Sequence, residues 1–474
     1  MKRSNFIFIS ILFSLISLSS KAQYSVNIEI EDNKDSIMYL GHYYLNNTYA
    51  LDTAYNKKGK FVFENKTKAL DPGIYFFSNS SGKYCEFLVD KDKSFSLITK
   101  ESDWVKYMKV KKSKDNEKYF DYLRGTSYFG EEANKINKLK GKISEKEFNE
   151  RMESVRNSND SIKENFIKNN PNHLLTKVLT ATKSVIIPEP KTIYKADNTI
   201  DSAAMQNERF DYYIHHYFDN IDLQHDGMLR TPEAVFYKTY NYYWDELMKY
   251  QTKDSIFSLA VHWIEKSRGT KNMFKFLVHD ITERYLKSPY MGHDEIYIKM
   301  INKYYASGDA TWMPPSAIDK EVSRARKWEN GMLMKTVPDL ACPDTNDVVH
   351  NLYSIKAKYK ILIFWSYDCG HCATEIPKIY KYYKENKETY DVEVMAVQSG
   401  ADLKQWKEKI AMLKLDWLNV NGLVANYDWH EYFDIESTPV IFILDKDNRI
   451  IGKKIPAENI ENYIKFYDEG KIKL

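Results

Sequence analysis

Hydrophobic and polar positions follow three different periods along the chain. Between residues 23 and about 100, apolar and polar residues alternate, and turn sequences such as Asp71-Pro72-Gly73 separate the short runs. The first of these runs places its apolar side chains at Tyr24, Val26, Ile28 and Ile30. Short alternating segments between turns predict strands with one buried face. We therefore expect residues 23–100 to form a small antiparallel β-sandwich.

From residue 101 to about residue 315 the apolar positions recur every three or four residues, which predicts a helical domain. One such face consists of Ile256, Leu259, Ala260, Trp263 and Ile264. The Pro- and Gly-containing segment 308–315 predicts a connector, and residues 316–330 predict one connecting helix. The aromatic-rich segment 236–244 is expected to pack in the core, although a peptide-binding groove remains an alternative.

Beyond residue 331 the order of elements becomes β-α-β-α-β-β-α, ending in a hairpin over 440–453 and a last helix. Alternation of this kind predicts a central sheet with helices on both faces. The fold class is therefore multidomain: an N-terminal antiparallel β-sandwich, a central α-helical domain and a C-terminal α/β domain over residues 331–474.

The first 22 residues have the pattern of a secretory signal peptide. Lys2 and Arg3 precede an apolar run over residues 6–18, and Ser20-Lys21-Ala22 has small residues around a cleavage position. The apolar run is too short to span a bilayer as a retained anchor. We expect cleavage after Ala22 and release into a periplasm, without a stable membrane span.

Charge and cysteine content narrow the function further. The formal net charge is +3, from 69 basic and 66 acidic residues, so no basic surface for nucleic acid is expected. Four cysteines in 474 residues are too few for a disulfide framework in an exported protein. Cys85 and Cys342 are expected to be free and buried, and a bond between them stays open as an alternative.

The other two cysteines form the segment Cys369-Gly370-His371-Cys372, which follows a predicted buried strand and opens a predicted helix. Amide groups at a helix start stabilise a thiolate and lower its pKa. Cys372 comes about one turn later, within reach of Cys369, as exchange through a mixed disulfide requires. Gly370 permits close backbone approach, and His371 is expected to lower the Cys369 pKa further.

Three other readings of the pair are weaker. A zinc site needs two more ligands, and neither His350 nor His430 has a paired spacing, so no metal or cofactor is expected. A peroxidatic cysteine would have proline and threonine upstream, where this chain has Leu362 and Ser366. A purely structural disulfide between residues this close would constrain little chain entropy.

Residues 331–474 resemble the TlpA/ResA-like group of thioredoxin-fold oxidoreductases. The resemblance rests on Trp365, the Cys-Gly-His-Cys segment, Glu375-Ile376-Pro377 and Ser437-Thr438-Pro439-Val440. It implies that Pro439 is the cis-proline facing the dithiol, that Thr438 presents its backbone to an extended substrate, and that Pro377 kinks the active-site helix. The middle region, through segment 212–220, also resembles a helical domain of unknown function often found upstream of such domains.

Two positions depart from thioredoxin. Asp368 replaces the usual tryptophan and places a negative charge beside the nucleophile, which opposes the thiolate. Ile363 replaces the buried aspartate, so that proton acceptor for Cys372 is missing. Glu375 could substitute as the acceptor, or could be an ordinary exposed helix residue.

These features predict a periplasmic thiol–disulfide oxidoreductase that reduces or isomerises disulfides in exported proteins. The resemblance favours a reductase supplied by a membrane electron donor, whereas the Gly370-His371 pair favours a more oxidising, isomerase-like dithiol. The alternative is an envelope adaptor whose upstream domains capture a partner and whose dithiol is secondary.

Overall fold

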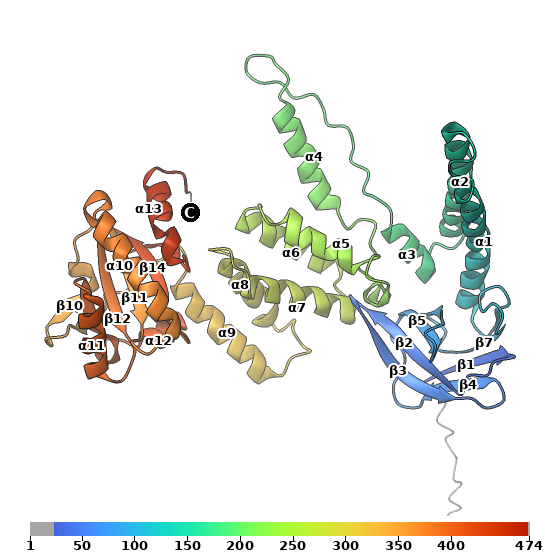
Figure 1. Cartoon of the computed structure of the whole chain (residues 1–474), viewed down its shortest axis with the longest axis horizontal. Coiled ribbons are helices and arrows are strands. Elements are labelled where there is room, and N and C mark those ends of the chain that lie inside the picture. The colour runs from blue at the N-terminus through green and yellow to red at the C-terminus, as the bar shows by residue number, and fades with distance from the viewer. Residues whose placement is uncertain (1–22, 473–474) are drawn as a thin grey trace, which may run out of the picture. The chain divides into compact units, whose positions relative to one another are not determined.

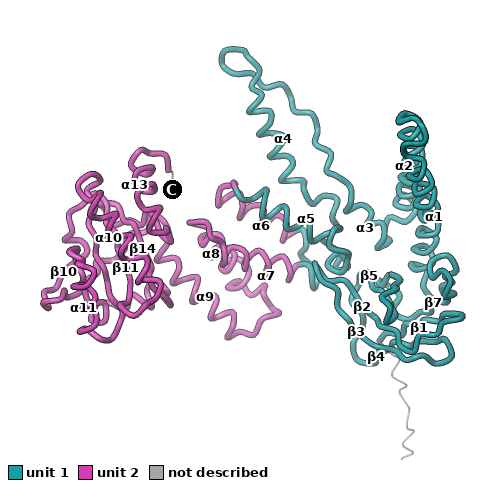
Figure 2. Tube along the Cα trace, viewed as in Figure 1, with its two compact units in different colours: residues 1–249, 266–273 teal, residues 250–265, 274–474 magenta. Residues whose placement is uncertain are grey.

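The computed structural model describes residues 23–472, so the expected signal peptide over 1–22 lies outside the described residues. The chain divides into two compact units (Figure 2). Unit 1 comprises the residues up to 249 together with 266–273, and unit 2 comprises 250–265 together with the residues from 274 onward.

Unit 1 begins with two four-stranded sheets (Figure 1), which confirms the predicted sandwich-like N-terminal part. The first sheet has the order β4-β1-β7-β8, with bounds Lys60–Asn65, Tyr24–Glu31, Ser94–Lys100 and Lys109–Lys111. The second has the order β3-β2-β5-β6, with bounds Asn47–Tyr55, Ile37–Tyr44, Gly73–Asn79 and Tyr84–Val89. Alternate residues of β1 are buried, as the period of two predicts.

The sandwich is not wholly antiparallel. β1 and β7 pair in parallel, with Val26 opposite Phe95. A parallel pair needs a long crossover, and here the strands from β2 to β6 lie between the two partners in sequence. The sequence pattern did not predict the β2–β3 hairpin. Strand β3 buries only Ala54, so buried and exposed residues do not alternate along it.

The helices of unit 1 follow the sheets. They are α1 (Lys114–Asn137), α2 (Glu145–Asn169), α3 (Leu174–Ala181), α4 (Ser202–His216) and α5 (Tyr237–Tyr242), and a π-helical turn continues α5. Helices α1 and α2 form an antiparallel hairpin in which no residue of α2 is buried. In the aromatic-rich segment Phe236, Tyr240, Tyr243 and Trp244 are buried, as expected for packing residues.

Unit 2 holds most of α6 (Lys253–Lys266) and α7 (Asn272–Leu286), followed by α8 (Asp294–Met300) and α9 (Pro315–Asn330). Pro315 occupies the first position of α9, where its missing N–H costs no intrahelical hydrogen bond. Between residues 23 and 472, no helix is both long and apolar enough to cross a bilayer.

The C-terminal part of unit 2 is a five-stranded mixed sheet, which confirms the predicted thioredoxin-like α/β fold. Its order is β13-β12-β11-β14-β15, with bounds Leu418–Asn421, Val392–Gln398, Tyr359–Trp365, Val440–Asp445 and Ile450–Lys453. The first three strands of this order are parallel to one another, and β14 and β15 run antiparallel to their neighbours. A separate hairpin joins β9 (Ala341–Pro343) and β10 (Val349–Asn351).

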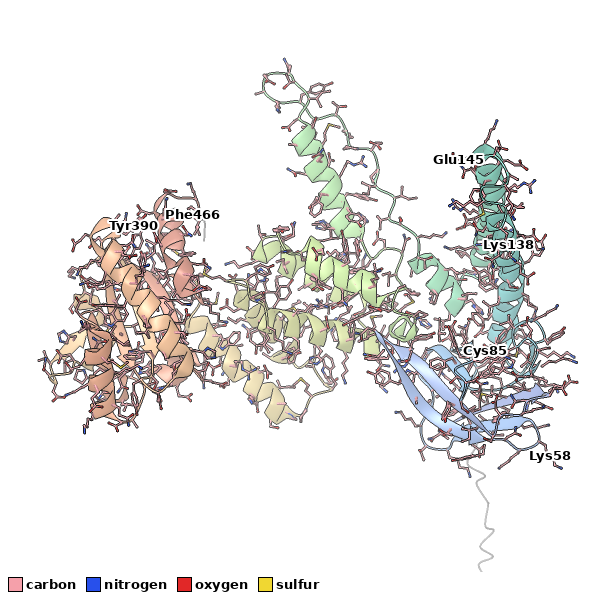
Figure 3. The ribbon with its side chains drawn as sticks, in the orientation of Figure 1. Lys58, Cys85, Lys138, Glu145, Tyr390 and Phe466 are labelled. Atoms are coloured by element: carbon pink, nitrogen blue, oxygen red, sulfur yellow. The ribbon has the colours of Figure 1, made fainter. Side chains whose placement is uncertain are left out.

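Helices cover both faces of this sheet, as its alternating elements predict. Residues Ile361, Ile363 and Trp365 of β11 pack with α10 (Gly370–Tyr390), α11 (Leu403–Leu413) and α13 (Ile460–Asp468). In Figure 3, Tyr390 marks the end of α10 and Phe466 lies on α13. Leu362 and Phe364 face the other way, against α12 (Trp429–Phe433) and residues 333–342. Strand β11 is therefore buried on both faces, and its end fixes the loop that follows.

The helical part of unit 2 covers the edge strand β15. The backbone N–H of Lys453 donates to Sδ of Met291 at 3.3 Å. The Lys453 ammonium group pairs with the Asp294 carboxylate and donates to the Gly331 carbonyl oxygen at 2.5 Å. These contacts occupy polar groups that an exposed sheet edge would offer to other chains.

Candidate functional site

The loop that leaves β11 places the two thiols. A short turn through Tyr367 and Asp368 leads to Cys369, the N-cap of α10, whose backbone is extended. The N–H of Cys372 donates to Sγ of Cys369 at 3.2 Å. Both thiols are free; Cys369 is half-buried and Cys372 is 1% exposed. One sulfur therefore faces the surface, with the second behind it at the first turn of the helix.

The environment separates the pKa values of the two thiols. Partial burial alone would raise the pKa of Cys369, but hydrogen bonds from the side chains of Cys372 and Thr438 and from the N–H groups of Cys372 and His371 outweigh it and lower the pKa. Burial, together with the hydrogen bond to Cys369, raises the pKa of Cys372 to about 12. The outer sulfur is thus the one that ionises first.

The loop before β14 lies opposite the outer sulfur. β14 pairs with β11, with Val440 opposite Phe364, which brings the preceding residues beside the start of α10. The Thr438–Pro439 peptide bond is cis. The Cys369 thiol donates to the Thr438 carbonyl oxygen at 3.1 Å, so the structure brings the two segments of the motif together.

Residues 399–402, which the sequence analysis did not identify, support the loop between β11 and Cys369. The hydroxyl of Tyr367 accepts a hydrogen bond from the N–H of Asp402 at 3.1 Å. A methyl group on Gly400 would lie 2.2 Å from the Tyr367 ring, so only glycine permits this approach. The N–H of Ser399 donates to the Trp365 carbonyl oxygen at 2.9 Å. Gly400, two residues after the predicted strand 392–398, was the available signal for this contact.

The residues expected to tune the dithiol lie around its rim. His371 is exposed, and its backbone N–H is one of the groups that lower the Cys369 pKa. Asp368 is exposed and accepts a hydrogen bond from the Ser366 hydroxyl. Gly370 has open space around its α-carbon, so its lack of a side chain leaves the first turn accessible.

Glu375, in the second turn of α10, connects this helix to the 3₁₀ turn Ala457–Asn459. One carboxylate oxygen pairs with Lys378 at 2.8 Å, and the other accepts from the N–H of Ala457 at 3.2 Å. These contacts favour an anchoring role over that of proton acceptor for Cys372. Ile363 is fully buried in the core that contains Cys372.

The remaining residues singled out in the sequence make no hydrogen bond with the two active-site sulfurs that the structure records. Trp365 is buried at the end of β11, and Pro377 is exposed within α10. Cys85 and Cys342 are free and buried, and burial raises the pKa of each to about 12. Over residues 23–472, no group of three His, Cys, Asp or Glu side chains is arranged to hold a metal ion.

Comparison with known proteins agrees with this geometry. Residues 357–450 match the family model described as thioredoxin-like, and residues 24–119 match a domain of unknown function, DUF4369. The latter match covers the two N-terminal sheets and the start of α1, and the resemblance of the helical middle region to a domain of unknown function stays a prediction. Among curated proteins, none matches this chain.

Several solved structures of bacterial proteins are similar to the chain. A domain of a possible thiol-disulfide isomerase from Cytophaga hutchinsonii is 35% identical, covering 30% of this chain and 95% of that one, with a TM-score of 0.28. A thioredoxin-like protein from Bacteroides caccae is 15% identical over 60% of this chain and 100% of that one, with a TM-score of 0.46. The thioredoxin domain of a Bacteroides vulgatus thiol-disulfide oxidoreductase is 23% identical over 28% and 96%, with a TM-score of 0.27.

The two cysteines at the start of α10, the sheet order and the match over residues 357–450 agree with one another. The 35% identity to the Cytophaga domain covers nearly all of that domain. The chain therefore belongs to the thioredoxin-like family, with a DUF4369 domain at its N-terminal end.

Proposed function

We propose that this chain is a protein thiol–disulfide oxidoreductase that reduces or isomerises disulfides in exported proteins. The observation that carries the proposal is the asymmetry of the dithiol. Cys369 is accessible and has a lowered pKa, whereas Cys372 is buried with a pKa of about 12. Thiol–disulfide exchange requires a nucleophilic thiol that ionises readily and a second thiol close enough to resolve the mixed disulfide.

The exchange follows from these positions. The Cys369 thiolate attacks one sulfur of a client disulfide, and the other client sulfur leaves as a thiolate that takes up a proton. Cys372 then loses its proton and attacks Sγ of Cys369, which releases the first client sulfur. Two electrons pass from the dithiol to the client, and a Cys369–Cys372 disulfide remains. The thiol of Cys372 needs a proton acceptor only in this second step.

Repeated turnover needs a donor that returns the Cys369–Cys372 disulfide to the dithiol. We propose a membrane thiol donor in the periplasm, the compartment to which the signal-peptide pattern in residues 1–22 would direct the chain. When a client offers a second free thiol, attack by that thiol on the mixed disulfide gives isomerisation without net electron transfer. The Cytophaga relative is described as a possible isomerase, which supports including this second outcome.

The test is reduction of insulin disulfides by the full chain, with dithiothreitol as the thiol donor. The wild type should accelerate reduction, and Cys369→Ser should be as slow as dithiothreitol alone. Because the Cys369 pKa is lowered, the rate of attack should rise with pH and level off below the usual cysteine pKa of about 8.5. A wild-type chain with no acceleration would contradict the proposal.

A further inference from the structure

Unit 2 contains a groove of about 450 Å³ beside the Thr438–Pro439 loop. We call it the α9 groove, because Trp328 and Arg324 of α9 form one wall and the loop residues form the other. Its apolar lining consists of Leu286, Trp328, Phe433, Ile435, Val440 and Phe442. Small ligands and single side chains occupy cavities of roughly 300–1,000 Å³ in other proteins.

The groove is continuous with the dithiol site along the backbone. Ile435, Glu436 and Ser437 line it, and the next residue, Thr438, accepts the hydrogen bond from Cys369. Glu436 and Ser437 are exposed, so a polypeptide lying along Thr438 meets no covering segment there. Three extended residues span about 10 Å, so the groove lies within a few residues of a cysteine under attack.

Three of the charged groups in the groove walls already have partners, while the Lys454 ammonium lies over the Trp328 ring at 5.1 Å and Glu436 is exposed. Arg324 pairs with Glu321 at 3.0 Å, Lys453 pairs with Asp294, and Asp434 accepts from the Trp328 indole N–H at 2.9 Å. A charged ligand bound against Arg324, Lys453 or Asp434 would have to compete with these pairs. An apolar side chain would instead cover the ring and aliphatic surfaces without that cost.

We propose that the α9 groove binds a large apolar side chain of the client polypeptide, close in sequence to the client cysteine that Cys369 attacks. This inference rests on the proposed function and adds a specificity to it. An extended client pairs with Thr438 in the antiparallel direction, as in strand addition. The residue bound in the groove then lies two to four positions after the client cysteine, by the spacing of extended chains (about 3.3 Å per residue).

The test uses the full chain and peptides whose single cysteine carries a chromogenic aryl disulfide. Two peptides differ only in having Phe or Ser three positions after the cysteine. The wild type should react about tenfold faster with the Phe peptide at subsaturating concentration, from partial burial of one aromatic side chain. Leu286→Trp, which fills the groove, should bring the ratio close to one. Ser323→Trp, on the exposed side of α9, should keep the wild-type ratio.

As a control, the rate of exchange of the wild type with hydroxyethyl disulfide, which has no flanking residues, is also measured. No exchange with it would contradict the proposed function itself, whereas exchange with equal rates for both peptides would overturn the groove alone. A second measurement needs no groove variant. A peptide with benzoylphenylalanine at the same position, held on Cys372→Ser as a mixed disulfide, should cross-link to the lining residues. Cross-links confined to other parts of the chain would overturn the proposal.

Discussion

At the scale of single residues, hydrogen bonds and burial divide the two thiols into an attacking and a resolving group. Against partial burial, hydrogen bonds from the Cys372 and Thr438 side chains and from the first-turn N–H groups lower the Cys369 pKa, while burial raises the Cys372 pKa to about 12. His371 contributes to the first effect through its backbone N–H. His371, one of the two residues between the cysteines, therefore acts through its peptide group as well as through any charge on its ring.

Replacing His371 by proline or by alanine separates these contributions. Proline has no N–H, so His371→Pro should raise the Cys369 pKa, whereas His371→Ala keeps the N–H and should leave it nearly unchanged. The redox potential should fall with the proline variant, and about 30 mV corresponds to about 1.4 kcal/mol for two electrons. Ultraviolet thiolate titration and glutathione equilibration measure the two quantities. An equal shift in the alanine variant would assign the effect to the imidazole ring instead.

Motif residues could be predicted from the sequence, but their partners could not. The Cys369–Cys372 spacing and the Thr438-Pro439 pair are local patterns, and the structure brings them together. Glu375 meets Ala457, 82 residues away, and Tyr367 packs against Gly400, so both contacts depend on how distant segments are placed by the fold. No local pattern distinguishes an anchoring carboxylate from a catalytic one.

At the scale of elements, helix α10 is fixed at its N-terminal end. Its first turn is capped by Cys369, and Glu375 connects its second turn to the 3₁₀ turn that precedes α13. Since Lys378 also pairs with Glu458 at 3.4 Å, the two segments share a small ionic network. This network holds the helix start without touching the thiols.

Glu375→Ala should lower the free energy of unfolding by about 1.5–2 kcal/mol, the lower part of the range for a hydrogen bond to a charged group. The pairing with Lys378 and the Ala457 N–H lowers the Glu375 pKa against partial burial, so its contribution is present above the usual carboxyl pKa. It is lost as the pH falls through the lowered value, and the gap between variant and wild type should then close.

Urea denaturation across acidic and neutral pH measures this gap. Glu385→Ala, an exposed glutamate of the same helix, is the matched control and should change stability by less than about 0.5 kcal/mol. The Cys369 pKa should stay at its wild-type value in both variants. Lost exchange activity in Glu375→Ala would favour the proton-acceptor role for this carboxylate.

Strands could be predicted from the sequence where one or both of their faces are buried. Strands β11 and β12 were evident as continuous apolar runs, because helices cover them on both sides. Strand β13 is only four residues long, and the exposed strand β3 has no periodic face, so neither stood out. The parallel pairing of β1 with β7 depends on chain topology, which alternation does not encode.

At the scale of the molecule, unit 2 joins helices α7 to α9 to the thioredoxin-like sheet. The buried Lys453–Asp294 pair lies at this junction, with side chains 7% and 11% exposed. Burial lowers the Lys453 pKa, and Asp294 opposes that shift. The predicted domain boundary near residue 331 thus lies between segments that the contacts of Lys453 in β15 with Met291, Asp294 and Gly331 connect.

Lys453→Met should destabilise unit 2 by about 3–5 kcal/mol, because it leaves the Asp294 carboxylate buried and unpaired. Adding Asp294→Leu should recover much of the loss, since the charge that lacks a partner is then removed. Lys446→Met, in the exposed turn after β14, is the control and should have little effect. Urea denaturation measures all three. A Lys453→Met chain as stable as the wild type would contradict the structural importance of the pair.

The most direct test of the account is the capture of mixed disulfides by the two serine variants in whole cells or envelope extracts. Cys372→Ser lacks the resolving thiol, so client proteins should stay bound to Cys369, and mass spectrometry should locate the bond at that residue. Cys369→Ser should capture none, because Cys372 is buried and its pKa is about 12. Clients captured by Cys369→Ser, and none by Cys372→Ser, would contradict the assignment of attacking and resolving thiols.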